Sequence, residues 1–152
     1  MTGGSSWQAS AELATKLQDA GFSGMLYTET SQVPWMQITA AALAAPELYF
    51  TTGIAVAFPR SPMVSAATAY EIAGNTGGRF RLGLGSQVKA HVTRRYSSEF
   101  DRPAARLKDY VEAVKARAGA HSTATSDSPT RASSTTSVSC RRTGRQSPTT
   151  KR

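Results

Sequence analysis

The hydrophobic and polar positions of this chain fall into blocks whose periods alternate between helix and strand. The first block, residues 10–20, carries its apolar residues on one helical face, with Ser10 as the N-terminal cap and Gly21 after the last turn. Residues 24–28 then form a short apolar run with polar residues after it, which is typical of a buried strand. We therefore predict a surface helix followed by a strand.

The same alternation continues along the chain. Pro34 and Pro46 bracket an alanine-rich helix over residues 35–45, and residues 48–54 form the next predicted strand. The dipeptide Ser61-Pro62 then caps and opens a third helix.

The third helix is expected to end at Gly77-Gly78, and residues 80–84 form a third predicted strand. A long polar loop is expected over residues 85–102. A fourth helix begins at Asp101-Arg102-Pro103. Its residues at helical spacing that are predicted to be buried are Leu107, Tyr110, Val111 and Val114.

This order of elements predicts an α/β fold with a parallel sheet, because strands that alternate with helices are joined by right-handed crossovers. A barrel and a doubly wound open sheet are the two alternatives. A dinucleotide-binding open sheet would carry Gly-x-Gly-x-x-Gly after a strand, but Val88 stands where the third glycine belongs. Gly83 and Gly85 are instead interpreted as small residues that let the end of the strand approach a neighbour or a ligand closely.

Composition divides the chain into three parts. The 152 residues include 18 Lys and Arg against 10 Asp and Glu, a formal net charge of +8. Residues 117–152 hold 7 − 1 = +6 of this charge, and 16 of their 36 residues are Ser or Thr. Such a segment lacks the apolar surface that offsets the entropy of ordering. We expect a disordered N-terminus over residues 1–9, a folded domain over residues 10–116 and a disordered basic tail over residues 117–152.

The single cysteine, Cys140, allows neither an intramolecular disulfide nor a cysteine-rich metal site, which fits a reducing compartment. Because the sequence shows no secretory signal and no apolar run long enough for a membrane span, a soluble cytoplasmic protein is expected. The charge raises the alternative of a small basic nucleic-acid-binding protein. However, residues 1–116 carry only 11 − 9 = +2, and no zinc pattern, RNA-binding signature or helix-turn-helix supports that alternative.

Three segments resemble the bacterial luciferase-like flavin and deazaflavin oxidoreductases. They are GFSG at residues 21–24, which leads into a strand that ends at Glu29, TGIAVAFPRSPM at residues 52–63, and GGRFRLGLGSQVKAH at residues 77–91. The third segment is the most specific, and it is similar to the actinobacterial subfamily assigned to coenzyme F(420), a 5-deazaflavin hydride carrier. The resemblance covers about residues 10–116.

The resemblance implies a (β/α)8 barrel in which the tricyclic ring of the cofactor lies at the C-terminal ends of the strands. It also implies a non-proline cis peptide bond at Gly53–Ile54, which would lie against one face of this ring. The implied catalytic candidates are Glu29, which replaces an aspartate common at the end of the second barrel strand, and His91, an imidazole expected in a loop over the pocket. The residues expected to bind the cofactor are Gly53, Ile54, Ala55, Gly85 and Ser86.

The same residues also have structural interpretations. Glu29 can cap or pair at the rim of the barrel, and Thr30 replaces the histidine that commonly follows the family aspartate. Trp35 matches a family aromatic near the pocket, but it also fits the core. A further set of cations can attract the anionic tail of the cofactor or can be solvated: Lys89, Arg94 and Arg95.

For the intact family, the resemblance implies hydride transfer between coenzyme F(420) and an unknown small organic substrate, in homo-oligomeric proteins. An FMN-dependent luciferase-like monooxygenase is the alternative. No membrane partner is expected, and nucleic acid is not an expected partner either.

A barrel of this type needs roughly 250 residues, so residues 10–116 can supply only about strands two to four. We therefore expect a truncated member of the family. The Ser/Thr/Arg composition after Val114 is typical of a GC-rich gene read out of frame, and we expect a frameshift near residues 115–120, which the coding DNA would test. A partial barrel leaves strand edges unpaired, so the chain alone is expected neither to bind deazaflavin nor to reduce it.

Overall fold

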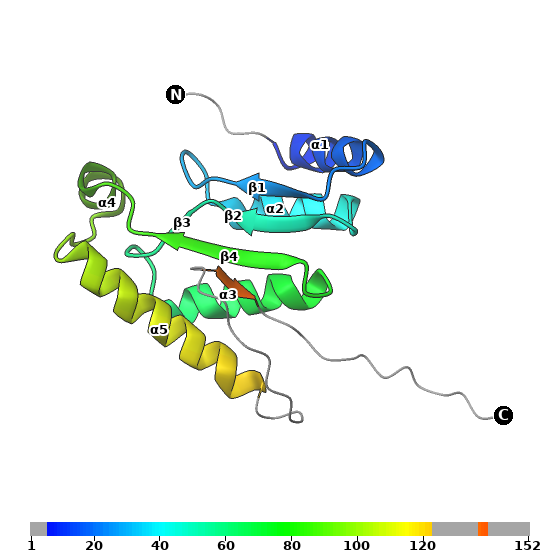
Figure 1. Cartoon of the computed structure of the whole chain (residues 1–152). Coiled ribbons are helices and arrows are strands. Elements are labelled where there is room, and N and C mark those ends of the chain that lie inside the picture. The colour runs from blue at the N-terminus through cyan, green and yellow to red at the C-terminus, as the bar shows by residue number, and fades with distance from the viewer. Residues whose placement is uncertain (1–5, 123–136, 140–152) are drawn as a thin grey trace.

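The computed structural model describes residues 6–122 and 137–139 (Figure 1). Helices and strands alternate up to β4, after which two helices and a short strand follow. In chain order the elements are α1 (Trp7–Asp19), β1 (Gly24–Tyr27), α2 (Pro34–Ala44), β2 (Tyr49–Thr52), β3 (Ala55–Val56), α3 (Pro62–Asn75), β4 (Phe80–Gly85), α4 (Lys89–Tyr96), α5 (Pro103–Ser122) and β5 (Ser137–Ser139).

The first helix begins earlier than the sequence predicts. Ser6 accepts a hydrogen bond from the backbone N–H of Ala9 at 3.1 Å and so caps α1, which starts at Trp7. Ser10, the expected cap, lies inside the helix and is only 4% exposed. The expected boundary of the fold at residue 10 is therefore corrected to Ser6, while residues 1–5 lie outside the described residues.

The signals that open and close α3 are confirmed. Ser61 accepts a hydrogen bond from the Val64 N–H at 3.2 Å, and Pro62 is the first helical residue. Gly77 and Gly78 follow the end of the helix with φ angles of 60° and 83°, in the left-handed region that favours glycine.

Strands β1 to β4 run parallel, with β1 paired to β2 and β4 paired first to β2 and then, further along the same side, to β3. The strand predicted over residues 48–54 is two strands, because β2 ends at Thr52 and pairing with β4 resumes only at Ala55. The bond Gly53–Ile54 between them is cis, as the resemblance implies.

Glycine allows the backbones of β2 and β4 to approach each other closely. A Cβ atom on Gly83 would lie 2.0 Å from the carbonyl oxygen of Thr52. The Thr52 hydroxyl donates to the Gly83 carbonyl at 2.8 Å and accepts from the Gly83 N–H at 2.9 Å. The predicted close approach at Gly83 is confirmed, and its partner is the neighbouring strand.

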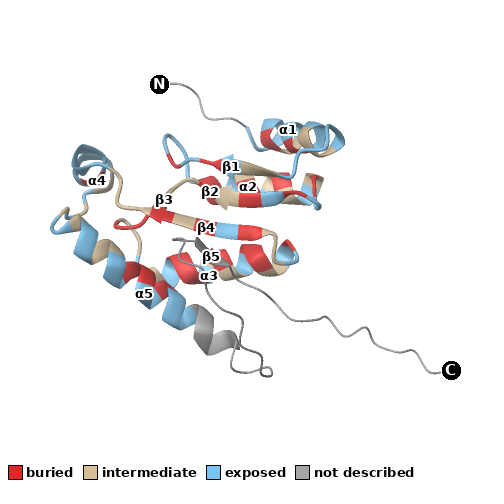
Figure 2. Cartoon of the chain, viewed as in Figure 1, coloured by how far each residue is buried: buried red, intermediate tan, exposed pale blue. Residues whose placement is uncertain are grey.

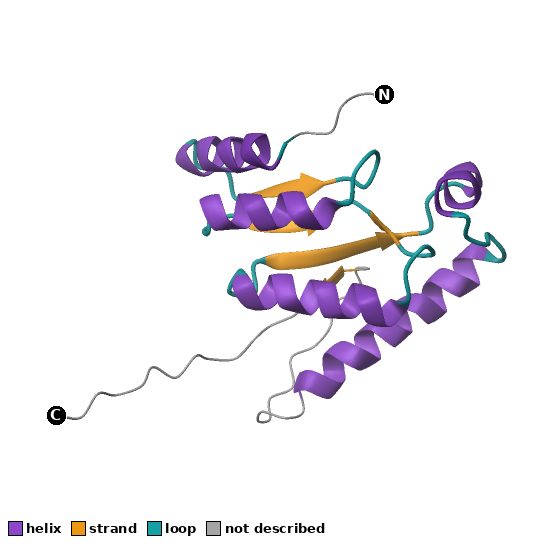
Figure 3. Cartoon of the chain, turned by 180° about the vertical axis from the view of Figure 1, so that it is seen from behind, coloured by secondary structure: helices purple, strands orange, loops and turns teal. Residues whose placement is uncertain are grey.

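Helices cover one face of the sheet (Figure 3). Phe50 and Leu82 are 1% and 0% exposed beneath them, whereas Leu26 and Tyr49 on the opposite face are 61% and 52% exposed. Figure 2 shows the same alternation of buried and exposed positions along the strands. A doubly wound sheet carries helices on both faces, so this arrangement matches an arc of a barrel with its inner face open.

The polar loop expected over residues 85–102 contains a helix, so that expectation is wrong. This helix, α4, buries a single side chain, Val92, and is followed by Ser97, whose φ of 49° lies in the left-handed region. One buried residue gives almost no apolar period, and therefore the pattern along the chain does not reveal this helix.

The last described elements extend past the predicted end of the domain. The predicted stripe on α5 is confirmed, since Tyr110, Val111 and Val114 are buried and Leu107 packs against the core. The helix continues beyond residue 116 to Ser122. β5 pairs antiparallel with β4. The other residues of the expected disordered tail lie outside the described residues.

Candidate functional site

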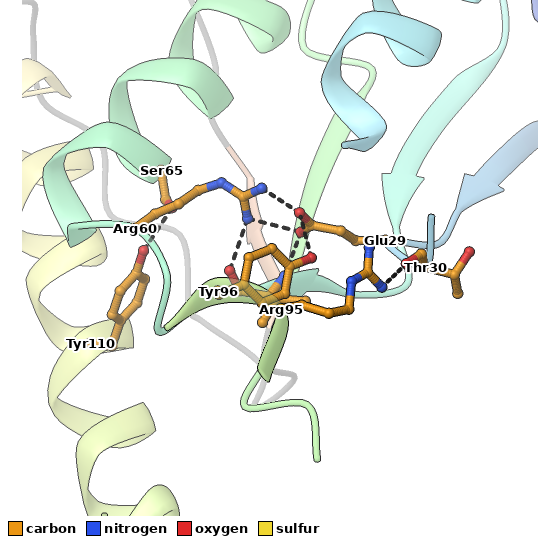
Figure 4. A network of polar contacts seen from close by, with 8 residues as sticks. Glu29, Thr30, Arg60, Ser65, Arg95, Tyr96 and Tyr110 are labelled. Atoms are coloured by element: carbon orange, nitrogen blue, oxygen red, sulfur yellow. Dashed lines mark hydrogen bonds and ion pairs between the residues drawn. The ribbon is translucent and has the colours of Figure 1, made fainter. Parts of the chain in front are cut away.

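A buried carboxylate lies at the C-terminal edge of the sheet. Glu29 follows β1, is 2% exposed, and accepts a hydrogen bond from the backbone N–H of Val56 at 2.8 Å. Both terminal nitrogens of Arg60 contact its carboxylate, with Nη1 at 2.8 Å from Oε2 and Nη2 against Oε1 (Figure 4). A two-pronged guanidinium–carboxylate pair is the strongest geometry open to these groups. The pair therefore ties the end of β1 to the segment between β3 and α3.

Arg60 is itself held on several sides. Its Nη1 also donates to the carbonyl of Val56 at 2.9 Å, and its guanidinium lies 5.6 Å from the ring centre of Trp35. The hydrogen bonds to Glu29 raise the pKa of the Arg60 guanidinium, and burial opposes this shift. Trp35 is 8% exposed and belongs to the core, which agrees with its structural interpretation.

Two neighbouring residues of α4, Arg95 and Tyr96, contact Glu29 and the residue after it (Figure 4). The Tyr96 hydroxyl lies 3.5 Å from Oε1 of Glu29, and Nη1 of Arg95 donates to the carbonyl of Thr30. Burial raises the pKa of the Tyr96 phenol, and the negative charge of Glu29 raises it further. The neutral phenol is thus the form that this position favours.

His91 lies on the same helix, not in a loop. Its side chain is exposed, and it precedes Arg94 and Arg95 by three and four residues, so the three share one helical face. Because Arg95 reaches the carbonyl of Thr30, this face is turned toward the loop after β1. The imidazole is exposed and makes no contact with the Glu29 carboxylate in the described part of the chain.

The predicted cofactor-binding residues line the same edge. Gly53 donates its N–H to the Tyr27 carbonyl at 2.8 Å, and the Ile54 carbonyl accepts from the N–H of Glu29 at 3.3 Å. The side chain of Ile54 lies over Gly85, since a Cβ atom there would approach Ile54 Cδ1 to 2.9 Å. Gly53 and Ile54 are thus held by hydrogen bonds to the end of β1 and by the contact of Ile54 with β4.

Ala55 and Ser86 differ in their access to this edge. Ala55 is 1% exposed and pairs with Leu84 in the sheet, so little of its surface can meet a ligand. Ser86 directly follows β4 and is half-buried. The sheet therefore brings together Glu29, Gly53, Ile54, Gly85 and Ser86, while the exposed His91 lies on α4.

A second polar contact joins α5 to α3. The hydroxyl groups of Tyr110 and Ser65 lie 2.7 Å apart, and the Tyr110 hydroxyl donates to the carbonyl of Ser61 at 3.1 Å. Ser65 is 1% exposed. Burial raises the pKa of the Tyr110 phenol, which the hydrogen bond with Ser65 lowers in part.

Arg60 and Tyr96 are the residues of this site that the sequence does not predict. Arg60 stands 31 positions after Glu29, and Tyr96 stands 67 positions after it, so no local spacing connects them. One signal was available in principle, because a buried carboxylate needs a cation or several donors. Arg60 directly precedes the Ser61-Pro62 signal of a helix start.

Two pockets lie away from the C-terminal ends of the strands. One, of about 420 Å³, lies on the open face of the sheet between Gly24, Tyr49 and Arg81. The other, of about 550 Å³, lies between α2 and α3, where Met36 and Leu43 are 51% and 82% exposed.

Two further searches covered the described residues. Within residues 6–122 and 137–139, no group of three or more His, Cys, Asp or Glu side chains is arranged to hold a metal ion. Among the helices of this part of the chain, none combines the length and the apolar character that a membrane crossing requires.

Curated relatives of this chain come from mycobacteria. The uncharacterized proteins Rv1360 of Mycobacterium tuberculosis and Mb1395 of Mycobacterium bovis are each 36% identical to it over 106 residues. The matches cover 70% of this chain but 31% of each relative. The chain thus spans about a third of the length of the curated relatives it matches.

Solved structures share the fold. The monooxygenase RslO1 from Streptomyces bottropensis superposes with a TM-score of 0.65 at 22% identity, over 71% of this chain and 35% of that one. A second structure is the oxygenating constituent of 3,6-diketocamphane monooxygenase from the CAM plasmid of Pseudomonas putida, a type II Baeyer–Villiger monooxygenase in complex with FMN. It superposes with a TM-score of 0.67 at 18% identity, over 78% of this chain and 37% of that one.

These similarities confirm the predicted fold class, a part of a luciferase-like (β/α)8 barrel. The model of the luciferase-like monooxygenase family matches residues 1–149, a wider span than the three motifs cover. The chain therefore belongs to the luciferase-like monooxygenase family.

Proposed function

We propose that this chain supplies the ring-binding edge of a flavin- or deazaflavin-dependent oxidoreductase. The observation that carries the proposal is the placement of Glu29, Gly53, Ile54, Gly85 and Ser86 at one edge of a parallel sheet, in a chain of this family. Parallel barrels place their chemistry at the C-terminal ends of their strands. The edge is therefore the part of this chain suited to a cofactor.

The residues at this edge fit a flat and largely apolar ring. Apolar side chains cover both glycines, since a Cβ atom on Gly53 would lie 2.5 Å from Leu26 Cδ1 and one on Gly85 would lie 2.9 Å from Ile54 Cδ1. The one buried charge nearby, Glu29, is already matched by Arg60, so the edge exposes no unpaired carboxylate to the ring. The Ser86 hydroxyl has no hydrogen-bond partner among the described residues and remains available as a donor.

Two cofactors are candidates. The resemblance of residues 77–91 to the deazaflavin subfamily favours coenzyme F(420), and the FMN in the structural relative from Pseudomonas putida supports the alternative. When bound, F(420) would supply the ring carbon that exchanges a hydride with a small organic substrate, whereas FMN in a monooxygenase would supply a reduced ring that reacts with oxygen.

The two catalytic candidates receive different roles. We assign proton exchange with the substrate to His91, because imidazole is a common general acid or base in enzymes and this side chain is exposed on the helix that also carries Arg95 and Tyr96. Glu29 has its oxygens engaged by Arg60, Val56 and Tyr96. It therefore acts as a positioning residue that holds β1, β3 and α4 in register around the ring.

We further propose that the chain, made alone, binds and reduces neither cofactor, because the sheet has helices on one face and an inner face open to solvent. Titration of the purified chain with F(420) and with FMN, followed by fluorescence, tests this. Binding in the micromolar range would contradict it.

A chimera tests the proposed function itself. Residues 6–116 of this chain would replace the matching segment of the curated relative Rv1360, which supplies the remaining length. We expect this chimera to bind one of the two cofactors, and the identity of the bound cofactor, read by mass spectrometry, distinguishes F(420) from FMN. Loss of binding in the chimera, while the parent relative retains it, would overturn the proposal.

Two subsidiary proposals concern the intact protein. We propose a homo-oligomer, and the exposed apolar residues Met36 and Leu43 beside the groove between α2 and α3 support a contact there. We also keep the cytoplasm as the proposed compartment. Light scattering of the chimera, with Leu43→Glu as the variant, tests the first, and the expected result is a smaller assembly.

A further inference from the structure

The outer edge of β4 is occupied by an unusual neighbour. Along one side β4 pairs with β2 and β3, both parallel to it. Along the other side it pairs with β5, which runs antiparallel and comes from the C-terminal part of the chain (Figure 1). In a (β/α)8 barrel every strand has two parallel neighbours, so β5 takes the edge that a following parallel strand would use.

The backbone of β4 shows which groups face this edge. The N–H and carbonyl of Gly83 both meet the Thr52 hydroxyl of β2, and the carbonyl of Gly85 accepts from Ala57 at 2.9 Å. Because the backbone groups of successive residues point to opposite sides of a strand, those of Leu82 point to the outer edge. Leu82 is the register partner of Val138, the central residue of β5.

We propose that the outer edge of β4 is a docking surface for an extended strand, and that the Ser137–Ser139 segment of this chain occupies it and so keeps other strands away. An unpaired edge presents N–H and carbonyl groups that pair readily with another chain. The three residues of β5 place Val138 opposite Leu82, so that they can pair with the outward N–H and carbonyl of Leu82. The chemistry that recognises this edge is the main-chain ladder of an antiparallel strand.

Two single proline substitutions, each made in the full chain, test the contact between β5 and β4. Val138→Pro removes the N–H of the residue opposite Leu82, whereas Ser139→Pro removes an N–H that points away from β4. We expect Val138→Pro to accelerate hydrogen exchange of the Leu82 amide by at least about tenfold, and Ser139→Pro to change it by less than about twofold. Unchanged exchange in Val138→Pro, or equal acceleration in both variants, would overturn the proposal.

A crosslink tests the register without weakening the fold. Arg81 and Ser139 are directly opposed and flank the Leu82–Val138 pair, so they form a pair without mutual hydrogen bonds, whose Cα atoms lie about 4.5 Å apart. Arg81→Cys with Ser139→Cys, in a Cys140→Ser background, is expected to form an intramolecular disulfide. The matched control is Arg81→Cys with Ser137→Cys, because Ser137 opposes Gly83. Equal crosslinking of both pairs, or none in either, contradicts the register.

Binding of a separate peptide tests whether the outer edge of β4 accepts a strand. The probe is a synthetic peptide of residues 133–143 with Cys140 replaced by Ser, added to the wild-type chain and to Val138→Pro. We expect the peptide to bind Val138→Pro at least about tenfold more tightly than the wild type, in which the edge is already occupied. Equal binding to both proteins would overturn the proposal, as would the absence of binding to Val138→Pro in a variant that remains monomeric and folded. If Val138→Pro instead self-associates and the peptide reverses this, the proposal is supported.

Discussion

The carboxylate of Glu29 and the guanidinium of Arg60 meet in a two-pronged pair that is closed to solvent on the side of Glu29, whose side chain is 1% exposed against 15% for Arg60. The pair joins the ends of two neighbouring βα units, and the Val56 N–H completes the donors around the carboxylate. Such pairs are sensitive to the loss of one member, because the other is left as an unmatched buried charge.

We expect Arg60→Ala to lower the free energy of unfolding by about 3 kcal/mol, at the low end for a buried pair because Arg60 keeps some exposure. Urea denaturation measures this. The control is Lys108→Ala, which removes an exposed pair with Glu112 at 3.9 Å and should cost less than about 0.5 kcal/mol. Equal losses in the two variants would show that the Glu29–Arg60 pair is not closed to solvent.

The contact between Tyr110 and Ser65 predicts a non-additive pair of substitutions. Tyr110→Phe leaves the buried Ser65 hydroxyl without its partner at 2.7 Å and should cost about 1–3 kcal/mol. Adding Ser65→Ala removes the orphaned hydroxyl, so the double variant should be no less stable than Tyr110→Phe alone. A double-mutant cycle in urea gives the coupling energy, and strict additivity would contradict a direct hydrogen bond.

Stability should fall at high pH. Burial raises the pKa of the phenols of Tyr27, Tyr96 and Tyr110 above the ordinary value near 10. The unfolded chain therefore releases these protons first, and the stabilisation is complete below pH of about 10 and is lost as pH rises through the folded pKa values. Unfolding free energies measured from about pH 8 to about pH 11 give the slope. Tyr27→Phe should reduce the slope, and a slope that it leaves unchanged would contradict the assignment.

Two glycines of β4 should respond differently to alanine. Gly83→Ala would drive a Cβ atom to 2.0 Å from a backbone oxygen, so the strands must separate, at a cost of about 3 kcal/mol. In Gly85→Ala the nearest atom is Ile54 Cδ1 at 2.9 Å, the end of a side chain that can rotate, and the cost should stay below about 1.5 kcal/mol. Thermal unfolding of the two variants ranks them, and the reverse order would contradict the close approach of β2 and β4.

Substitution of His91 is expected to affect catalysis but not stability. Because its side chain is exposed, His91→Ala should change stability by less than about 0.5 kcal/mol. In the chimera with the relative, the same substitution should lower turnover by about 100-fold or more if the imidazole exchanges a proton with the substrate. Unchanged turnover would remove His91 from the chemistry, while loss of stability would show a structural role.

The alternation of helices and strands could be predicted from the sequence because each unit carries local signals. Pro34, the Ser61-Pro62 pair and Gly77-Gly78 act within a few residues of the element they bound. Either Ser6 or Ser10 has a side chain suited to cap a helix, which is why the sequence predicts the wrong one. In the structure Ser6 caps α1, while Ser10 is buried and hydrogen-bonds to the Tyr27 phenol.

The candidate site could be predicted only in part. Its glycines and Glu29 follow strands, so their common edge follows from the topology, whereas the partners of Glu29 come from distant positions. Arg60 and Tyr96 meet Glu29 only because three units and α4 converge, and no local pattern encodes such convergence. The break between β2 and β3 is likewise set by pairing with β4.

The strand order has a consequence for how the molecule can form. β1 pairs with β2 and β2 pairs with β4, so each sheet contact among these strands joins units that are consecutive along the chain. Such a chain behaves as a short linear array with nearest-neighbour coupling, in which each added unit docks on the one made before it. β5 is the exception, since it must return across more than fifty residues to reach β4. Its docking is thus the last and the most non-local step of assembly, and the one whose rate a change in the intervening chain length would alter first.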